Sequence, residues 1–356
     1  MDDGRIDRGA FLRRAGVVAG AAGLAGAGWP IGRSLGGQLA QRRRPPLGDL
    51  ARAAQGPLLT PGSAAYSAAR QVANARYSDA RSLAVLRARS VSDVRQAVLW
   101  CARNGVRIAA RSGGHSYAGY STLDGGLVVD LSGRAGVAIA ADRRTVEVGA
   151  GAPLIDLYSA LARRGLTVPA GSCPTVGVGG LALGGGVGLA SRALGTTCDN
   201  LVSLTVVTAD GRALVCDPRR NADLFWACRG GGGGNFGIAT SLTFRTHRVG
   251  VASYFFASFP WSDAAEVVAA WQRWAPHAPD ELFSICSLST GSGSPTVTVF
   301  GQYMGSTAAL RRALGGLTRA VPPRRLTVGA SGYLDMVLRW AYYGTNLARL
   351  VDVKTA

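Results

Sequence analysis

The chain has 356 residues, which is enough for two domains of ordinary size, each with its own hydrophobic core. Apolar residues make up 47% of it and charged residues 17%, a balance that excludes an intrinsically disordered protein. The formal net charge is +18, but the basic residues are mostly arginines scattered along the chain, without a nucleic-acid-binding motif. We interpret the charge as a compositional bias that favours an anionic surface or ligand. Six cysteines at irregular spacing and three histidines form no metal-binding pattern, so no metal site is expected.

Residues 1–46 have the pattern of a signal-like segment and a linker. Basic residues precede a weakly apolar Ala/Gly run over residues 15–29, which is the order found in export signals. The Arg-x-x-Phe-Leu-Arg spacing from Arg8 to Arg13 resembles a twin-arginine signal, although Gly9 stands where the second arginine is usual. The run is shorter than the about 20 apolar residues of a stable membrane span. We expect export by this route, with a cytoplasmic location or an unstructured extension as the alternatives.

The first domain is expected over residues 47–250, and it contains a strand–helix–strand unit. Residues 83–89 have the composition of a strand, and Ser92 is expected to cap a helix that ends at Asn104-Gly105. A strand over residues 106–110 follows. Such a unit places the next loop at the carboxyl end of a sheet, where ligands bind.

The other elements of this domain follow from local patterns of apolar and turn residues. Residues 127–131, which are apolar except for Asp130, are interpreted as one apolar strand buried on both faces. Gly165 is expected to end the helix over residues 153–164. The remaining expectations are a helix over 49–55, strands over 145–148, 203–208, 213–216 and 238–244, a turn at 209–211 and a short helix over 221–227.

Two glycine-rich loops each carry one nucleophilic side chain. The first is Arg111-Ser112-Gly113-Gly114-His115-Ser116-Tyr117-Ala118-Gly119. The second runs from Gly171-Ser172-Cys173-Pro174-Thr175-Val176-Gly177-Val178-Gly179-Gly180 into Gly184-Gly185-Gly186-Val187-Gly188. Glycine permits positive φ and close approach of the backbone to a ligand, and successive N–H groups form concavities that bind anions. The pair of loops therefore indicates a large phosphorylated cofactor that is held from two sides.

The glycine-rich loops have other possible interpretations. A P-loop is excluded because no Gly-Lys-Ser/Thr follows any of the glycine runs. A Rossmann fingerprint fits residues 177–182 or 232–237 only loosely, and the second is followed by a strand where that motif needs a helix. A glycine loop can also be a plain turn, and a lone cysteine a small buried hydrophobe.

The character of the chain changes after about residue 251. Strands are expected over residues 254–259, 285–288 and 296–303, and helices over 264–275 and 307–314. This order is typical of one antiparallel sheet with helices on one side. The sequence therefore predicts an α+β protein.

At this point the sequence resembles the berberine-bridge-enzyme-type FAD-linked oxidoreductases, whose flavin domain is shared with vanillyl-alcohol oxidase and p-cresol methylhydroxylase (PCMH). The R-S-G-G-H loop, the G-x-C-P-T-V-G-x-G-G loop and the stretch Gly234-Asn235-Phe236-Gly237-Ile238 match the family's motifs. The resemblance implies a two-subdomain FAD-binding domain over 47–250 and an antiparallel-sheet substrate domain over 251–340. A C-terminal segment over 341–356 would return to the flavin domain.

The resemblance also implies a bicovalent FAD. In that family a histidine bonds the flavin 8α-methyl group and a cysteine bonds C6, and the matching residues here are His115 and Cys173. The residues implied to bind the cofactor are Arg111, Ser112, Gly113, Gly114, His115, Ser116, Gly119, Gly171, Cys173, Val176, Gly177, Gly179, Gly180, Gly184, Gly185, Gly188, Asn200, Gly237, Ile238, Tyr343 and Asn346.

The chain departs from the family pattern near its end. Residues 333–340 resemble the end of the first half of the substrate domain, and residues 341–354 resemble the family's C-terminal segment, with Tyr342 and Tyr343 near the flavin. The second half, which supplies the catalytic base in that family, is missing between them. The substrate domain is thus expected to be incomplete, and the catalytic residues stay unknown.

The function implied is the oxidation of a sugar, an alcohol or a secondary metabolite by hydride transfer to the flavin. Oxygen or another electron acceptor would then reoxidise the cofactor. Two alternatives stay open: a flavin-binding but inactive remnant, and a basic protein that binds the cell envelope or nucleic acid. We expect a small-molecule substrate and no nucleic-acid partner.

Overall fold

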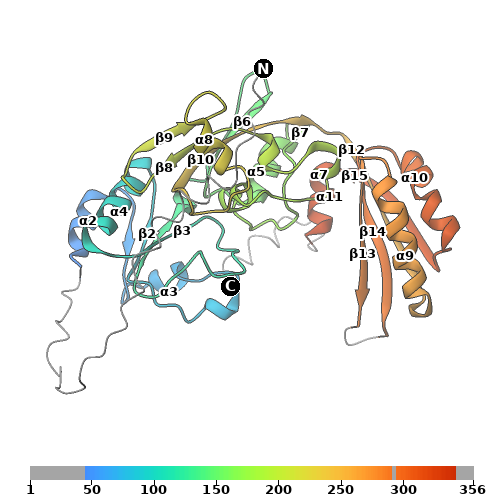
Figure 1. Cartoon of the computed structure of the whole chain (residues 1–356), viewed down its shortest axis with the longest axis horizontal. Helices are drawn as coiled ribbons and strands as arrows, with labels where there is room; N and C mark the ends of the chain where they lie inside the picture. Colours follow the sequence, from blue (N-terminus) through green and yellow to red (C-terminus); the bar gives the residue numbers. More distant parts are fainter. Residues whose placement is uncertain (1–44, 291–293, 342–356) are drawn as a thin grey trace, which may run out of the picture. The chain divides into compact units, whose positions relative to one another are not determined.

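The computed structural model describes residues 45–290 and 294–341 (Figure 1). The predicted export signal lies outside the described residues, and so do Tyr342, Tyr343, Asn346 and most of the predicted C-terminal segment. Export therefore stays a prediction. Among the helices that are described, none is long and apolar enough to cross a membrane.

The first sheet has the strand order β1-β2-β4-β3. Its strands are β1 (Leu58–Leu59), β2 (Ala84–Arg87), β3 (Ile108–Arg111) and β4 (Leu127–Asp130), and α2 (Leu47–Ala53) and α3 (Tyr66–Ala69) accompany them. β2, β4 and β3 are parallel, and β1 pairs with β2 in the antiparallel sense. Every residue of β4 is buried, as predicted for residues 127–131.

Helix α4 (Val91–Asn104) connects β2 to β3 and is stabilised by a capping box. The expected cap, Ser92, is wrong, because the N-cap is Ser90, two residues earlier. The Ser90 hydroxyl accepts a bond from the Asp93 N–H at 3.1 Å, and the Asp93 carboxylate accepts from the Ser90 N–H at 3.2 Å. The helix ends as predicted at Gly105, which has φ 63°.

The second sheet is antiparallel throughout, with the order β5-β6-β10-β8-β9. Its strands are β5 (Val137–Ile139), β6 (Thr145–Gly149), β8 (Leu201–Val207), β9 (Ala213–Cys216) and β10 (Ile238–Arg245). The predicted turn closes between β8 and β9, where the Gly211 N–H donates to the Thr208 carbonyl and Gly211 has φ 77°. A two-stranded sheet pairs β7 (Leu166–Thr167) with β11 (His247–Arg248).

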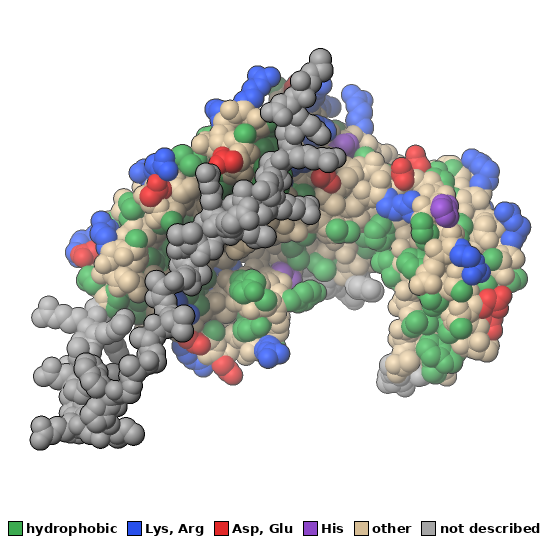
Figure 2. Space-filling view, viewed as in Figure 1, with side chains coloured by type: hydrophobic (Ala, Val, Ile, Leu, Met, Phe, Trp, Pro, Cys, Tyr) green, Lys and Arg blue, Asp and Glu red, His purple; other side chains and the backbone are tan. Residues whose placement is uncertain are grey.

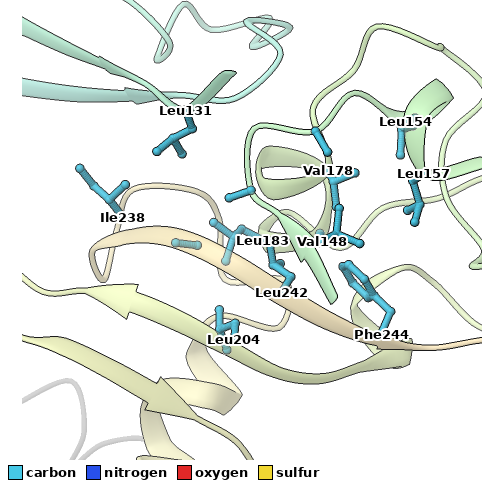
Figure 3. Close-up of a cluster of buried hydrophobic side chains, with 14 of the residues drawn as sticks. Leu131, Val148, Leu154, Leu157, Val178, Leu183, Leu204, Ile238, Leu242 and Phe244 are labelled. Carbon is cyan, nitrogen blue, oxygen red and sulfur yellow. The ribbon is translucent and has the colours of Figure 1, made fainter. Parts of the chain in front are cut away.

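The core of this half lies between the second sheet and its helices (Figure 3). Leu154 and Leu157 of α5 (Leu154–Ala162) are fully buried, as the helical spacing predicted, and Val178 of α6 (Val178–Leu183) joins them. They pack with the buried Leu242 and Phe244 of β10. α5 ends at Ala162, before the expected Arg164, and Gly165 follows with φ 67°. Two short helices complete this half: α7 (Ser191–Leu194) and α8 (Ala222–Ala227).

After residue 250 the chain forms one antiparallel sheet with the order β13-β14-β12-β15. Its strands are β12 (Val251–Phe259), β13 (Leu282–Ser289), β14 (Thr296–Tyr303) and β15 (Arg325–Gly332). As predicted, helices α9 (Ala264–Trp274) and α10 (Thr307–Ala320) cover one face of this sheet (Figure 1). Alternate residues of β12 are buried beneath these two helices: Phe255, Ala257 and Phe259.

The opposite face of this sheet carries an aromatic cluster that joins it to α11 (Tyr333–Trp340). The Phe256 and Phe300 rings stack with centroids 5.7 Å apart, and the Trp340 ring stacks on Phe300 at the same distance. Trp340 Nε1 also donates to Gln302 Oε1 at 3.2 Å. At the start of α11, Tyr333 meets α5, because its ring lies 6.4 Å from that of Tyr158. β15 and α11 were not predicted as elements, but the predicted α+β class is confirmed.

Candidate functional site

The two glycine loops are in direct backbone contact. The first follows β3, and the second lies between β7 and α6. A Cβ atom on Gly113 would lie 2.6 Å from the Thr175 carbonyl oxygen and would also strike the Gly177 nitrogen. A Cβ on Gly177 would fall on the Ser112 hydroxyl and the Gly113 nitrogen. Real Cβ atoms do not approach other atoms so closely, so only glycine allows these two loops to meet.

His115 and Cys173 lie on these two touching loops. His115 Nε2 is 2.9 Å from the Thr175 hydroxyl, and Thr175 is two residues beyond Cys173. His115 is half-buried, and this burial lowers the pKa of its imidazole. The ring is therefore neutral and nucleophilic at neutral pH. The Cys173 thiol is exposed, so it is accessible to a reacting partner.

The first loop presents a run of free backbone donors. Among the described residues, no backbone or side-chain group accepts from the N–H groups of Gly113 to Tyr117. Gly114 has φ 74°, a conformation that L side chains rarely adopt. Successive free N–H groups of this kind form a concavity suited to phosphate oxygens.

The second loop adds open space beside these donors. The N–H groups of Val178 and Gly179 donate to the carbonyls of Ala152 and Ala150, so the start of α6 is fixed. Gly180 is exposed, and a Cβ atom placed on it would meet nothing within 4 Å. A ligand can thus approach the backbone there. The two loops together fit a phosphorylated cofactor with a reactive ring near His115 and Cys173.

Hydrogen bonds hold the second loop against α5. The Leu154 N–H donates to the Val176 carbonyl at 2.9 Å, and the Ile155 N–H donates to the Pro174 carbonyl at 3.0 Å. The Tyr158 hydroxyl donates to the Gly171 carbonyl at 3.0 Å. The segment that carries Cys173 is therefore positioned by a rigid, buried helix.

Arg111 and Ser112 make contacts within the fold. The Arg111 guanidinium is buried, 3.0 Å from the Asp130 carboxylate, and it also donates to the carbonyl of Ala69. The Ser112 hydroxyl donates to the Ala150 carbonyl at 2.5 Å. These two side chains fix the start of the first loop relative to β4 and to the end of β6. Their contacts thus support the loop that carries the N–H groups of Gly113 to Tyr117.

Asn200 and the loop before β10 also hold the backbone in place. Asn200 is buried, and its Nδ2 donates to the carbonyls of Leu194 and Thr196, each at 2.9 Å. Its Oδ1 lies 2.6 Å from His247 Nε2. Gly237 has φ 139°, and a Cβ there would strike the Val207 carbonyl, so β10 can begin only after a glycine.

Of the other predicted glycines, Gly119 and Gly188 allow close packing, and Gly184 and Gly185 shape the backbone after α6. Gly119 is buried against the Tyr77 ring, which a Cβ would approach to 2.5 Å, and Gly188 is packed against the Ala170 carbonyl. Gly185 has φ 111°, and its carbonyl accepts from the Cys198 N–H at 2.8 Å. The Gly184 N–H closes α6 by donating to the Gly180 carbonyl.

Sequence reasoning missed two residues of this site. Thr175 lies within the second motif, but nothing in its pattern indicates that it contacts His115 across the loops. Asp130 closes the buried β4, and its position directly after an apolar strand was the only available signal. Both contacts join residues far apart in the sequence, so local patterns cannot find them.

The sequence is similar to FAD-linked proteins. Residues 82–217 match the FAD binding domain family model. The chain is 37% identical over 258 residues to the uncharacterized FAD-linked oxidoreductase YgaK of Bacillus subtilis, covering 71% of this chain and 57% of that protein. It is 33% identical over 264 residues to the chitooligosaccharide oxidase of Gibberella zeae, covering 72% of this chain and 52% of the relative.

The structural similarity points in the same direction. The model superposes on the wild-type berberine-bridge-enzyme-like protein 1 of Physcomitrella patens with a TM-score of 0.78 and 33% identity. This match covers 83% of the chain and 64% of the solved structure. The chain thus spans between about half and two thirds of the length of these relatives. The chain thus contains an FAD-binding domain, and its homologues and structural neighbours include berberine-bridge-enzyme-like and vanillyl-alcohol-oxidase-type FAD-linked oxidoreductases.

Proposed function

We propose that the protein is an FAD-linked oxidoreductase whose flavin is bonded covalently to His115 and Cys173. The observation that carries this proposal is the backbone contact between the two loops, which brings a neutral imidazole and an exposed thiol to neighbouring positions. The 8α-methyl group and C6 are the flavin positions that these side chains would bond. Two such links would fix the ring and raise its potential.

The residues of the loops would bind and orient the cofactor. The free N–H groups of Gly113 to Tyr117 would donate to its phosphate oxygens. Thr175 would orient the His115 ring, because a bond at Nε2 leaves Nδ1 as the free nitrogen. When bound, the flavin would accept a hydride from the substrate.

The proposed substrate is a small molecule with an oxidisable alcohol carbon, such as a sugar. The relatives named chitooligosaccharide oxidase and xylooligosaccharide oxidase support this class. Oxygen or another electron acceptor would then reoxidise the flavin. No catalytic base is assigned.

Flavin fluorescence on the denatured polypeptide tests the covalent links. The purified protein is denatured in acid and run on a gel, together with His115→Ala, Cys173→Ala and the double variant. We expect fluorescence to survive each single change and to vanish in the double variant. A dark band from yellow wild-type protein would mean that FAD binds without a covalent link, and a colourless protein would overturn the proposal.

A second candidate function is a flavoprotein that holds FAD without turning over substrate. The observation in its favour is the sequence pattern, in which residues 341–354 directly follow residues 333–340 without the segment that supplies the catalytic base in the resembled family. Anaerobic mixing with chitobiose, xylobiose and glucose separates the two candidates. Bleaching of the flavin absorbance by a sugar supports the oxidoreductase. Flavin that only dithionite can bleach supports the inactive flavoprotein.

A further inference from the structure

A strongly basic cavity lies apart from the glycine loops. It has a volume of about 750 Å³, and the described residues that line it include five arginines, Arg143, Arg144, Arg164, Arg245 and Arg248, and one acidic residue, Asp142. Elsewhere, on the face shown in Figure 2, basic side chains (blue) are dispersed over the surface with acidic ones (red) among them. The cavity is therefore a local concentration of one charge.

The strand register places this cavity at the far end of the second sheet. Thr145 and Arg245 pair at the cavity end of β6 and β10, and Gly149 and Ser241 pair at the other end. Ala150, which follows Gly149, contacts the glycine loops through Ser112. With a rise of about 3.3 Å per strand residue, the two ends are about 13 Å apart. The cavity is thus separate from the flavin site.

Hydrogen bonds tie together the segments that carry the arginines. The Thr246 hydroxyl donates to the Arg143 carbonyl at 2.6 Å, and the Thr246 N–H donates to the Arg144 carbonyl at 3.0 Å. The Val249 N–H donates to the Gly165 carbonyl at 3.0 Å, next to Arg164. Arg143 has φ 58°, in the left-handed region that favours glycine. A strained arginine backbone at this turn is a feature often found at binding sites.

Among the described residues, the five guanidinium groups have no partner of opposite charge. In the part of the chain that the structure describes, none of them lies within 4.0 Å of a carboxylate or donates a side-chain hydrogen bond. By contrast, Arg111, Arg192 and Arg229 each pair with an aspartate. Gathering like charges is unfavourable, and a cleft lined by one sign of charge attracts the opposite ion. Consistently, burial and the nearby charge of Arg245 lower the pKa of His247.

We propose that this cavity binds a small molecule that carries a diphosphate group. A guanidinium group can donate two parallel hydrogen bonds to the oxygens of one phosphate. Five guanidinium groups are more than a single phosphate group can bind, so we infer a diphosphate. The volume lies in the range of small-molecule sites. Leu166, Val202 and Val249 also line the cavity, and they would contact an uncharged part of a larger ligand. The inference does not depend on the proposed oxidoreductase activity.

Calorimetric titration of the flavin-loaded protein with inorganic pyrophosphate, at constant ionic strength, tests the proposal. The pocket variant is Arg164→Gln with Arg248→Gln. The matched control is Arg311→Gln with Arg312→Gln, which removes the same charge from the exposed surface of α10. We expect the pocket variant to bind at least about tenfold more weakly, since it loses several charge-assisted hydrogen bonds. The control should stay within about twofold of the wild type.

A second pocket variant tests whether weaker binding could result from a loss of structure. Arg143→Gly removes one guanidinium and suits the positive φ, so it should weaken pyrophosphate binding without lowering Tm. Titration with ADP distinguishes the sources of the diphosphate. Tighter binding of ADP than of pyrophosphate assigns a nucleotide, and equal or weaker binding assigns inorganic diphosphate.

Three results would overturn the proposal. One is equal affinity of the pocket variant and the α10 control for pyrophosphate. Another is a flavin spectrum that shifts with the same Kd as pyrophosphate binding, because this would place the anion at the flavin. The third is binding of duplex DNA alone, with both variants weakened equally, which would mean general charge attraction.

Discussion

The glycine loops and the sheet of β12 to β15 achieve close packing in opposite ways. In the loops, Gly113 and Gly177 bring two backbones together because neither has a side chain. In the sheet, Phe255 and Phe259 fill the space beneath α9 and α10 with large buried rings. The contact between the loops therefore depends on the absence of side chains, whereas the packing of the sheet depends on large apolar side chains. Adding a methyl group should therefore damage the first, and removing a ring should damage the second.

The largest expected effect is that of Gly177→Ala. Its Cβ would strike the Ser112 hydroxyl and the Gly113 backbone, so we expect a loss of about 4 kcal/mol or more in the free energy of unfolding, or no soluble protein. The matched control is Gly180→Ala, where a Cβ meets nothing within 4 Å and helix propensity improves. Urea unfolding of the flavin-free proteins measures both. Similar stability of the two variants would contradict the backbone contact.

The next effect is that of Phe255→Ala in the sheet. This ring is fully buried, so we expect a loss of about 3–5 kcal/mol in the free energy of unfolding. Ile285→Ala on β13 is the control, because 38% of that side chain is exposed, and it should cost less than about 1 kcal/mol. Thermal unfolding followed by circular dichroism measures the difference. A Phe255→Ala protein as stable as the control would show that the ring packs loosely.

Asp93 provides a contrast to the first glycine loop. Its side chain accepts hydrogen bonds from backbone N–H groups, whereas the N–H groups of the first loop have no acceptor among the described residues. Its carboxylate accepts from the N–H groups of Gln55, Arg89 and Ser90. We expect Asp93→Ala to cost about 2 kcal/mol at pH 7, since it removes one half of the capping box and leaves these donors unpaired. Urea unfolding at pH 7 measures this loss, and a loss below about 0.5 kcal/mol would contradict it.

The contribution of Asp93 should depend on pH in a definite direction. Although burial raises the pKa of Asp93, the bonds from Arg89, Gln55 and Ser90 lower it by more, so the pKa lies below its ordinary value. The stabilisation is then full above the unfolded pKa of about 3.9 and is lost as the pH falls through the folded value. The difference in stability between wild type and Asp93→Ala should be constant from pH 5 to 7 and shrink below about pH 4. A difference that grows on acidification would refute this.

The smallest effect concerns His115 and rests on the proposed covalent link. Burial lowers the pKa of this imidazole, so it stays neutral below the ordinary value of about 6.5. In Cys173→Ala protein reconstituted with FAD, we expect the yield of covalent flavin to change less than about twofold between pH 8 and 6.5. Fluorescence of the denatured band gives the yield. A yield that halves above pH 6.5 would show an imidazole of ordinary or raised pKa.

Several elements could be predicted because their signals are local. Gly105 ends α4 where the Asn-Gly pair predicted, and the apolar run of β4 indicated a strand buried on both faces. β15 was missed because its sequence, Arg-Leu-Thr-Val-Gly-Ala-Ser-Gly, mixes glycine with small polar residues and carries little strand pattern. It is a strand because it pairs with β12 along its whole length. The cap of α4 was misplaced because Ser90 and Ser92 are both suitable, and Asp93 decides between them.

By itself, the sequence determined the two glycine loops, the nucleophiles His115 and Cys173 within them, and the α+β order of the elements. These features depend on short runs of residues whose conformational limits are fixed locally. Only the tertiary structure decided that Thr175 meets His115, that Arg111 pairs with Asp130, and that five scattered arginines surround one cavity. The pairing of β3 with β4 places Arg111 opposite Asp130, and the arginine cavity forms where β6 pairs with β10 and β7 with β11, strands about 80 to 100 residues apart in the sequence. Local patterns do not encode pairings at that distance, so charges that look dispersed in the sequence can gather in space.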